Sequence, residues 1–351
     1  MCGASFLRRC LLLIVTCCPP LASLPALAED GGKTSTGDFA ACVQRLALNS
    51  SDITTIGEIR TRCRLAEDKK ELSAVPEPQQ PDSGAFEKKL IIDQENIRKP
   101  FTMMAHRANY LLLAAHNFHG WSGADFAAGN QSELGDPKRT EAQFQLSGKM
   151  PLAVNLFDLP LDIYAGYTMR SFWQVYNTEH SSPFRETDHE PEAWLQLRPG
   201  WRLWGWTNSL NTIGINHQSN GQSDSLSRSW NRIFAGIVLE KGNFSLIPRA
   251  WFRLQEDRAD DDNPDISDYL GHGELTLAWR HYNNTFTAML RNNLDSGFSR
   301  GAWQLGWSFP LLSFPYFRGY IQYFGGYGES LIDYDRYVSR IGIGMSLTDL
   351  L

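Results

Sequence analysis

Three polar residues in the second half of the chain, His217, Ser219 and Asn231, have the side-chain types of a hydrolytic triad. A histidine can take the proton of a serine hydroxyl as a general base, and a third polar group can orient the imidazole through its other ring nitrogen. A neutral asparagine still selects the tautomer, although it gives less charge support to the imidazolium ion. On spacing alone, an interfacial polar cluster with no catalytic role remains an open alternative.

The sequence around these residues predicts that they share one surface. His217 and the serine are two residues apart in an alternating segment, so they lie on one face, together with Ile213 and Ile215. Asn231 lies on the corresponding apolar face of the next alternating segment, and an outer loop, 220–228, joins the two. Because paired strands lie about 4.8 Å apart, we expect Asn231 within hydrogen-bond reach of His217, on a face that contacts lipid.

The segments that position these residues are predicted to be β-strands, because apolar and polar residues alternate from about residue 109 to the end. An even number of long antiparallel strands is typical of a single-chain outer-membrane barrel. We therefore predict an all-β fold, a twelve-stranded antiparallel transmembrane β-barrel with a short N-terminal periplasmic extension. The candidate strands are roughly 109–116, 140–152, 160–176, 192–199, 206–219, 228–240, 243–255, 273–282, 285–294, 301–309, 316–327 and 335–348.

Charge and hydropathy agree with a barrel. The face opposite the apolar one carries many arginines, which is the inverse of a soluble protein; they are Arg170, Arg198, Arg232, Arg249, Arg253, Arg280, Arg291, Arg318 and Arg340. The net charge of −6, without a Lys/Arg-rich run, excludes nucleic acid as the main partner. No apolar run reaches the roughly 18 residues of a helical membrane span. A secreted β-sandwich with one solvated face is the alternative fold.

The chain before the barrel divides into two predicted regions. Residues 1–28 have a basic start, an apolar stretch and the Ala26-Leu27-Ala28 cleavage pattern of a signal peptide. Residues 29–104 form an N-terminal extension with a proline-rich linker, and residues 105–351 form the barrel domain. Cys42 and Cys63 remain after cleavage in an exported chain, and we predict that they form a disulfide.

The resemblance to a known family is carried by several ordered motifs. These are Asn216-His217-Gln218-Ser219-Asn220-Gly221-Gln222-Ser223-Asp224, Ser227-Arg228-Ser229-Trp230-Asn231-Arg232, Ser181-Ser182-Pro183-Phe184-Arg185-Glu186-Thr187, Asp262-Asn263-Pro264-Asp265-Ile266 and Gly326-Tyr327-Gly328-Glu329-Ser330-Leu331-Ile332-Asp333-Tyr334. Together they resemble outer membrane phospholipase A. They span about residues 181–334, and weaker similarity covers the rest of the barrel.

The resemblance implies a phospholipase of the outer membrane that is active at the A1 and A2 positions and on lysophospholipids. It implies calcium-dependent homodimerisation, with Ser219 as nucleophile, His217 as base, Asn231 as orienting residue and the Gly221 amide as oxyanion donor. The implied calcium oxygens are the Gln222 carbonyl, Ser227, Ser181 of the other subunit and Asp224 in a second, monomer site. Calcium prefers such oxygen ligands.

Some features depart from the family pattern or stand apart from it. Met169 occupies the position of a dimer-interface glutamine, which removes a polar contact across the dimer. The chain ends in Leu350-Leu351 rather than in an aromatic residue. The acidic stretch 256–265 lacks the spacing of an EF-hand and is interpreted as a solvated outer loop.

Because the predicted triad faces lipid, we expect lateral access of substrate and low activity until two subunits associate.

Two other functions are compatible with a barrel. A small porin or structural scaffold with an arginine-lined lumen would have no chemistry at Ser219. A protease of the omptin type would use Asp and His groups at the barrel mouth and would not need this serine either. Loss of turnover in Ser219→Ala distinguishes the phospholipase from both.

Overall fold

The computed structural model describes residues 43–44, 46–47, 84–97, 99, 102–121, 137–180, 182–257, 261–292, 296–297, 299–311 and 314–350. The predicted signal peptide, the cysteines Cys42 and Cys63, and Ser181 lie outside the described residues, so their predicted roles stay predictions. The chain divides into two compact units, Met1–Gln79 and Gln80–Leu351. In the first unit the described residues, 43–44 and 46–47, are helical.

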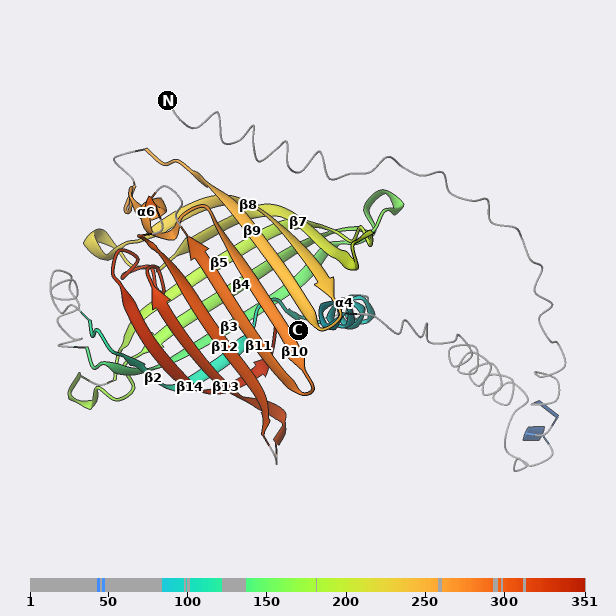
Figure 1. Cartoon of the computed structure of the whole chain (residues 1–351), viewed down its shortest axis with the longest axis horizontal. Coiled ribbons are helices and arrows are strands. Elements are labelled where there is room, and N and C mark those ends of the chain that lie inside the picture. Colours follow the sequence, from blue (N-terminus) through green and yellow to red (C-terminus); the bar gives the residue numbers. More distant parts are fainter. Residues whose placement is uncertain are drawn as a thin grey trace. The chain divides into compact units, whose positions relative to one another are not determined.

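The second unit is a closed antiparallel β-barrel, as predicted (Figure 1). Each long strand pairs with its neighbours along the chain. The sheet closes because β2 pairs with both β14 and β3. The twelve barrel strands are β2 (Asn109–Asn117), β3 (Thr140–Ala153), β4 (Leu161–Trp173), β5 (Phe184–Leu197), β7 (Trp206–Ser219), β8 (Ser229–Lys241), β9 (Phe244–Leu254), β10 (Gly273–His281), β11 (Asn284–Asn292), β12 (Gly301–Leu311), β13 (Phe314–Gly326) and β14 (Val338–Thr348).

One strand differs clearly from its predicted bounds. β5 begins at Phe184, whereas the predicted strand begins at residue 192. The intervening residues are rich in charge, which is typical of a loop in a soluble sheet. Here the even-numbered side chains point into the lumen, where Glu190 is buried against Arg232, and Arg185, at a bulge in the pairing with β4, is buried against Glu141. Because the interior of the barrel is polar, this charged segment forms a strand, although its composition is typical of a loop.

The two faces of the sheet have the polarity predicted from the alternation. The outer face exposes large apolar residues, among them Ile213 (51%) and Ile215 (60%). The lumen instead holds buried ionic groups, such as Arg185 and Arg340, which both bind Glu141 at 2.9 Å. This inverted arrangement excludes the β-sandwich. No helix in the part of the chain that the structure describes is long and apolar enough to cross a membrane.

The strand connections distinguish the two ends of the barrel. At one end β8 turns directly into β9, and β10 into β11, through pairs of residues that include Gly242 (φ +56°) and Tyr282 (φ +49°). Positive φ suits the twist of two-residue hairpin turns. The opposite end carries the longer connections, including 220–228 and 255–272. His217 and Ser219 end strand β7 at this second end.

A helix before the barrel belongs to the barrel unit. α4 (Ala85–Asn96) lies at the short-turn end, near the C-terminus (Figure 1). Its first turn is held by Phe86 N–H, which donates to Glu240 Oε1 at 2.8 Å, and its last turn by an ion pair of 2.7 Å between Asp93 and Lys149. Leu90 packs against residues of β7 and β8. The remaining elements are β1 (Met104–Ala105), β6 (Arg202–Leu203), η1 (Leu156–Asp158), η2 (Thr178–His180), η3 (Asp224–Leu226) and α6 (Ile266–Leu270).

Candidate active site

The pairing of β7 with β8 brings the predicted base and its orienting residue together. His217 and Asn231 are direct partners across the two strands. Their side chains form a hydrogen bond of 2.8 Å between His217 Nδ1 and Asn231 Oδ1. The amide oxygen accepts, so Nδ1 carries the proton and Nε2 is left free to accept one. This is the tautomer that a general base requires.

Ser219 lies on the same outer face, two residues further along β7. It is half-buried, and its partner across the β5–β7 pair is His189. Within the described residues, no hydrogen bond joins Ser219 Oγ to His217. Pro191 lies nearby in β5, where the ladder to β7 is interrupted because proline has no N–H. His189 Nδ1 bonds the Tyr167 hydroxyl at 2.6 Å, which gives the site a polar border.

The loop after Ser219 is held by a buried asparagine. Asn220 Nδ2 donates to the Leu226 carbonyl at 2.8 Å, and its Oδ1 accepts from Arg228 N–H at 3.0 Å. Gly221 has a left-handed backbone (φ +65°), which glycine adopts without strain. Among the described residues the Gly221 N–H donates to no acceptor. This amide, two residues after Ser219, is available to a ligand.

The predicted calcium residues that the structure describes, Gln222, Asp224 and Ser227, lie in one outer loop, 220–228. Ser227 Oγ donates to Asp262 Oδ2 at 2.5 Å, and Ser227 N–H donates to the Asp224 carbonyl at 3.1 Å. Asp224 and Asp262 belong to different loops, so Asp262, from the acidic stretch 256–265, contacts the predicted site instead of facing solvent alone. The described residues include no group of three or more His, Cys, Asp or Glu side chains suited to a metal. Any cation here would need hydroxyl and carbonyl oxygens too, including that of Gln222.

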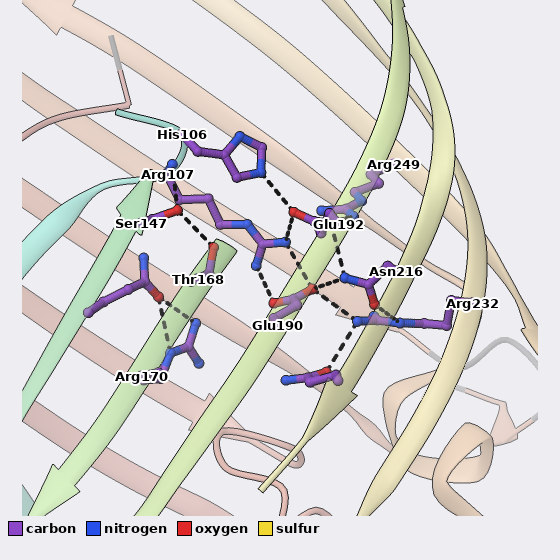
Figure 2. Close-up of polar contacts among 12 residues, drawn as sticks. His106, Arg107, Ser147, Thr168, Arg170, Glu190, Glu192, Asn216, Arg232 and Arg249 are labelled. Carbon is purple, nitrogen blue, oxygen red and sulfur yellow. Dashed lines mark hydrogen bonds and ion pairs between the residues drawn. The ribbon is translucent and has the colours of Figure 1, made fainter. Parts of the chain in front are cut away.

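A buried polar network lies behind the site, on the lumen face of the same strands (Figure 2). Asn216, next to His217 in the chain, donates to Glu190 Oε1 at 2.7 Å and accepts from Arg232 Nε at 2.9 Å. Glu190 also pairs with Arg232 at 3.0 Å and with Arg107 at 2.6 Å. The network joins β5, β7 and β8 at the point where the backbone ladder between β5 and β7 is interrupted, and so holds these strands in register.

Some contacting residues were missed by reasoning from the sequence. Asn231 Nδ2 donates to Glu256 Oε1 at 2.8 Å, and Asp262 contacts Ser227. Both carboxylates belong to the connection after β9, whose path sequence periodicity does not describe. One signal was available for Glu256, because it is two residues beyond the outward-facing Leu254.

The fold and the site define an outer-membrane β-barrel enzyme of the hydrolase class. Residues 86–347 match the family model described as phospholipase A1. A phospholipase A1 of Escherichia coli is 36% identical over 254 residues, which cover 72% of this chain and 83% of the relative. A putative phospholipase A1 of Neisseria meningitidis is 37% identical over 275 residues, covering 74% and 69% of the two chains.

Solved structures agree with the sequence comparisons. The outer membrane phospholipase of Salmonella typhi, a dimer with bound calcium, superposes with a TM-score of 0.68 at 34% identity, covering 74% of this chain and 98% of that one. Outer membrane phospholipase A of Escherichia coli gives 0.66 at 35% identity, covering 72% and 100%. The chain belongs to the phospholipase A1 family, which confirms the predicted fold, outer-membrane location and enzyme class.

Proposed function

We propose that this phospholipase cleaves acyl esters at the A1 and A2 positions of glycerophospholipids, and of lysophospholipids, with Ser219, His217 and Asn231. The observation that carries the proposal is the 2.8 Å hydrogen bond between His217 Nδ1 and Asn231 Oδ1 on the lipid-facing surface, beside Ser219. Polar groups on such a surface are costly in free energy, and their presence there indicates a function.

The geometry supports a two-step acyl transfer. As Ser219 Oγ attacks the ester carbonyl carbon, His217 Nε2 takes the hydroxyl proton. The tetrahedral intermediate collapses when His217 returns that proton to the departing glycerol oxygen, leaving an acyl group on Ser219. A water molecule, deprotonated by His217, then attacks this ester, and His217 returns the proton to Ser219 Oγ as the fatty acid is released. Asn231 holds the imidazole in one tautomer and orientation throughout.

The Gly221 amide is the proposed oxyanion donor. Its N–H follows the nucleophile by two residues, and a donor of this kind stabilises the negative charge that develops on the carbonyl oxygen. Asn220 fixes the loop on both sides, so the donor is oriented before substrate arrives. The left-handed glycine backbone allows this orientation.

The oxygen set beside the site fits calcium. Ser227, Asp262 and the Gln222 carbonyl would hold one ion, with Ser181 contributed by the partner subunit, and Asp224 would belong to a second site in the monomer. The fit rests on the 2.5 Å contact between Ser227 Oγ and Asp262, which joins a hydroxyl and a carboxylate from two loops. Bound calcium would supply positive charge near the developing oxyanion.

Homodimerisation would complete the site and control it. The triad faces lipid rather than the lumen, so substrate reaches it laterally from the bilayer. A permanently active lipase would damage its own membrane, and dependence on a second subunit keeps activity low until lipid and calcium bring two barrels together. Across a series of crosslinked samples, activity should rise with the dimer fraction, and fully active monomers would contradict this regulation.

Fatty-acid release from phospholipid micelles by the refolded protein tests the proposal. We expect release that requires calcium and is lost both in Ser219→Ala and with a chelator. Release that needs Ser219 but not calcium would retain the hydrolase and refute the metal site. A folded, dimeric barrel without any release would favour the porin or scaffold.

A further inference from the structure

A carboxylate lies behind the orienting asparagine. Asn231 Nδ2 donates to Glu256 Oε1 at 2.8 Å, while Asn231 Oδ1 accepts from His217. The amide thus connects an imidazole on one side to a carboxylate on the other. Along the outer face, Glu256 is thus followed by Asn231, then His217, and then Ser219.

The barrel register explains why Glu256 reaches this position. Asn231 pairs with Leu254, the last residue of β9. Glu256 continues the same outward parity two residues later and so reaches back towards β8. It is half-buried, and no described Lys, Arg or His lies within ion-pair distance. The hydrogen bond to Asn231 is therefore its one side-chain partner among the described residues.

We propose that Glu256 is a positioning residue for the reaction, acting on His217 through Asn231. This inference rests on the proposed role of the triad. A carboxylate can only accept a hydrogen bond when ionised, so Glu256 selects the amide orientation in which Nδ2 faces it and Oδ1 faces His217. A flipped amide would present a donor to a donor and would turn the imidazole away from its catalytic tautomer.

Glu256 also restores a charge that a neutral asparagine cannot supply. Its negative charge polarises the Asn231 amide, which increases the partial negative charge on Oδ1 and stabilises the imidazolium that forms during acyl transfer. The chain thereby obtains a carboxylate-supported histidine with an amide inserted between the two groups. Charge support transmitted in this way affects the chemical step rather than lipid binding.

Single substitutions provide the first test, measured as kcat and KM in the calcium-loaded full-length protein. We expect Glu256→Ala to lower kcat about tenfold, because a charge-assisted hydrogen bond is lost, with KM unchanged. Glu256→Gln keeps an acceptor but not the charge, and should lose roughly threefold. Asp257→Asn, which removes a neighbouring exposed carboxylate, is the matched control and should match the parent enzyme. Unfolding midpoints identify any variant that fails through instability.

Two double variants separate positioning from a structural role. In an Asn231→Ala background, Glu256→Ala should cause no further loss, because the residue that transmits its effect is absent. Asn231→Asp alone places two carboxylates in contact and should be poorly active. Adding Glu256→Gln removes the repulsion, gives His217 a direct carboxylate partner and should recover at least about tenfold in kcat.

Three results would overturn the inference. They are an unchanged kcat in Glu256→Ala, an equal loss in Asp257→Asn, and a full additional loss when Glu256→Ala is added to Asn231→Ala. If Ser219→Ala or Asn231→Ala itself stays active, the proposed triad fails. If those two variants lose activity while Glu256→Ala does not, only the role of Glu256 fails.

Discussion

Asn216 offers a test of whether the lumen network supports the outer site. Its side chain is buried and makes three hydrogen bonds, donating to Glu190 at 2.7 Å and Glu192 at 3.1 Å and accepting from Arg232 at 2.9 Å. Asn216→Ala removes all three, each to a charged group that contributes about 1.5–3 kcal/mol. The prediction is a large loss in the free energy of unfolding.

The expected magnitude is smaller than the sum of the three bonds. Glu190 and Arg232 keep their own ion pair at 3.0 Å, and both line a lumen cavity of about 370 Å³ in which water can solvate them. We therefore expect a loss of about 3 kcal/mol, close to the cost of one buried charged group left without its partner. Urea unfolding of the refolded barrel, followed by tryptophan fluorescence, measures it.

Thr212→Val is the matched control. Thr212 lines the lumen from the same strand, but its hydroxyl makes a long hydrogen bond of 3.4 Å to the Gly236 carbonyl. We expect it to cost about 0.5–1 kcal/mol. The reasoning is refuted if Asn216→Ala unfolds within 0.5 kcal/mol of the parent, or if Thr212→Val costs as much as Asn216→Ala.

Three further predictions follow from separate parts of the structure. Gly221→Ala places a side chain on a backbone with φ +65°, where the nearest atom of His189 is 3.7 Å away, so it meets no clash. Backbone strain should instead destabilise the loop by about 1 kcal/mol and lower kcat, which urea unfolding and turnover measurements would show. Asp262→Asn removes a charged oxygen and should raise the calcium concentration for half-maximal activity about tenfold, whereas Asp257→Asn should leave a calcium titration unchanged. Burial, assisted by the charge of Lys149, lowers the pKa of Lys89 to about 8 from 10.5. Between these two pH values the undocked helix binds more protons than the docked one, so the docking of α4 should strengthen as the pH rises through this window. Proteolysis of residues 84–97 should therefore slow with rising pH in the parent protein relative to Lys89→Met, and parallel pH profiles for the two proteins would contradict this.

Local alternation predicted most of the barrel because each strand needs one lipid-facing and one lumen-facing side. β7 has its predicted bounds, 206–219, and the predicted contact between His217 and Asn231 is present. Both follow from a period of two and from the single outer loop that joins the two strands. The same reasoning failed for β5, whose first half looks like a loop until its partners across the lumen are known.

The features that were missed depend on contacts between distant parts of the chain. Glu256 meets Asn231 and Asp262 meets Ser227 only after the long connection following β9 returns over β8. α4 was not predicted either, because its stability comes from the barrel: Glu240 caps its first turn and Lys149 neutralises a carboxylate in its last. These partners are distant in the chain, so the sequence of residues 85–96 alone does not indicate them.

The pleat of β7 explains how one strand supplies both chemistry and support. His217 faces outward and Asn216 faces inward, so a single peptide bond connects the lipid-facing site to the buried charges of the lumen. An apolar lumen could pack against β7 but could not compensate for the ladder interruption at Pro191 with directed hydrogen bonds. The polar interior therefore fixes the register of the three strands that place Ser219, His217 and Asn231, and a lipid-facing site can be rigid without a protein core behind it.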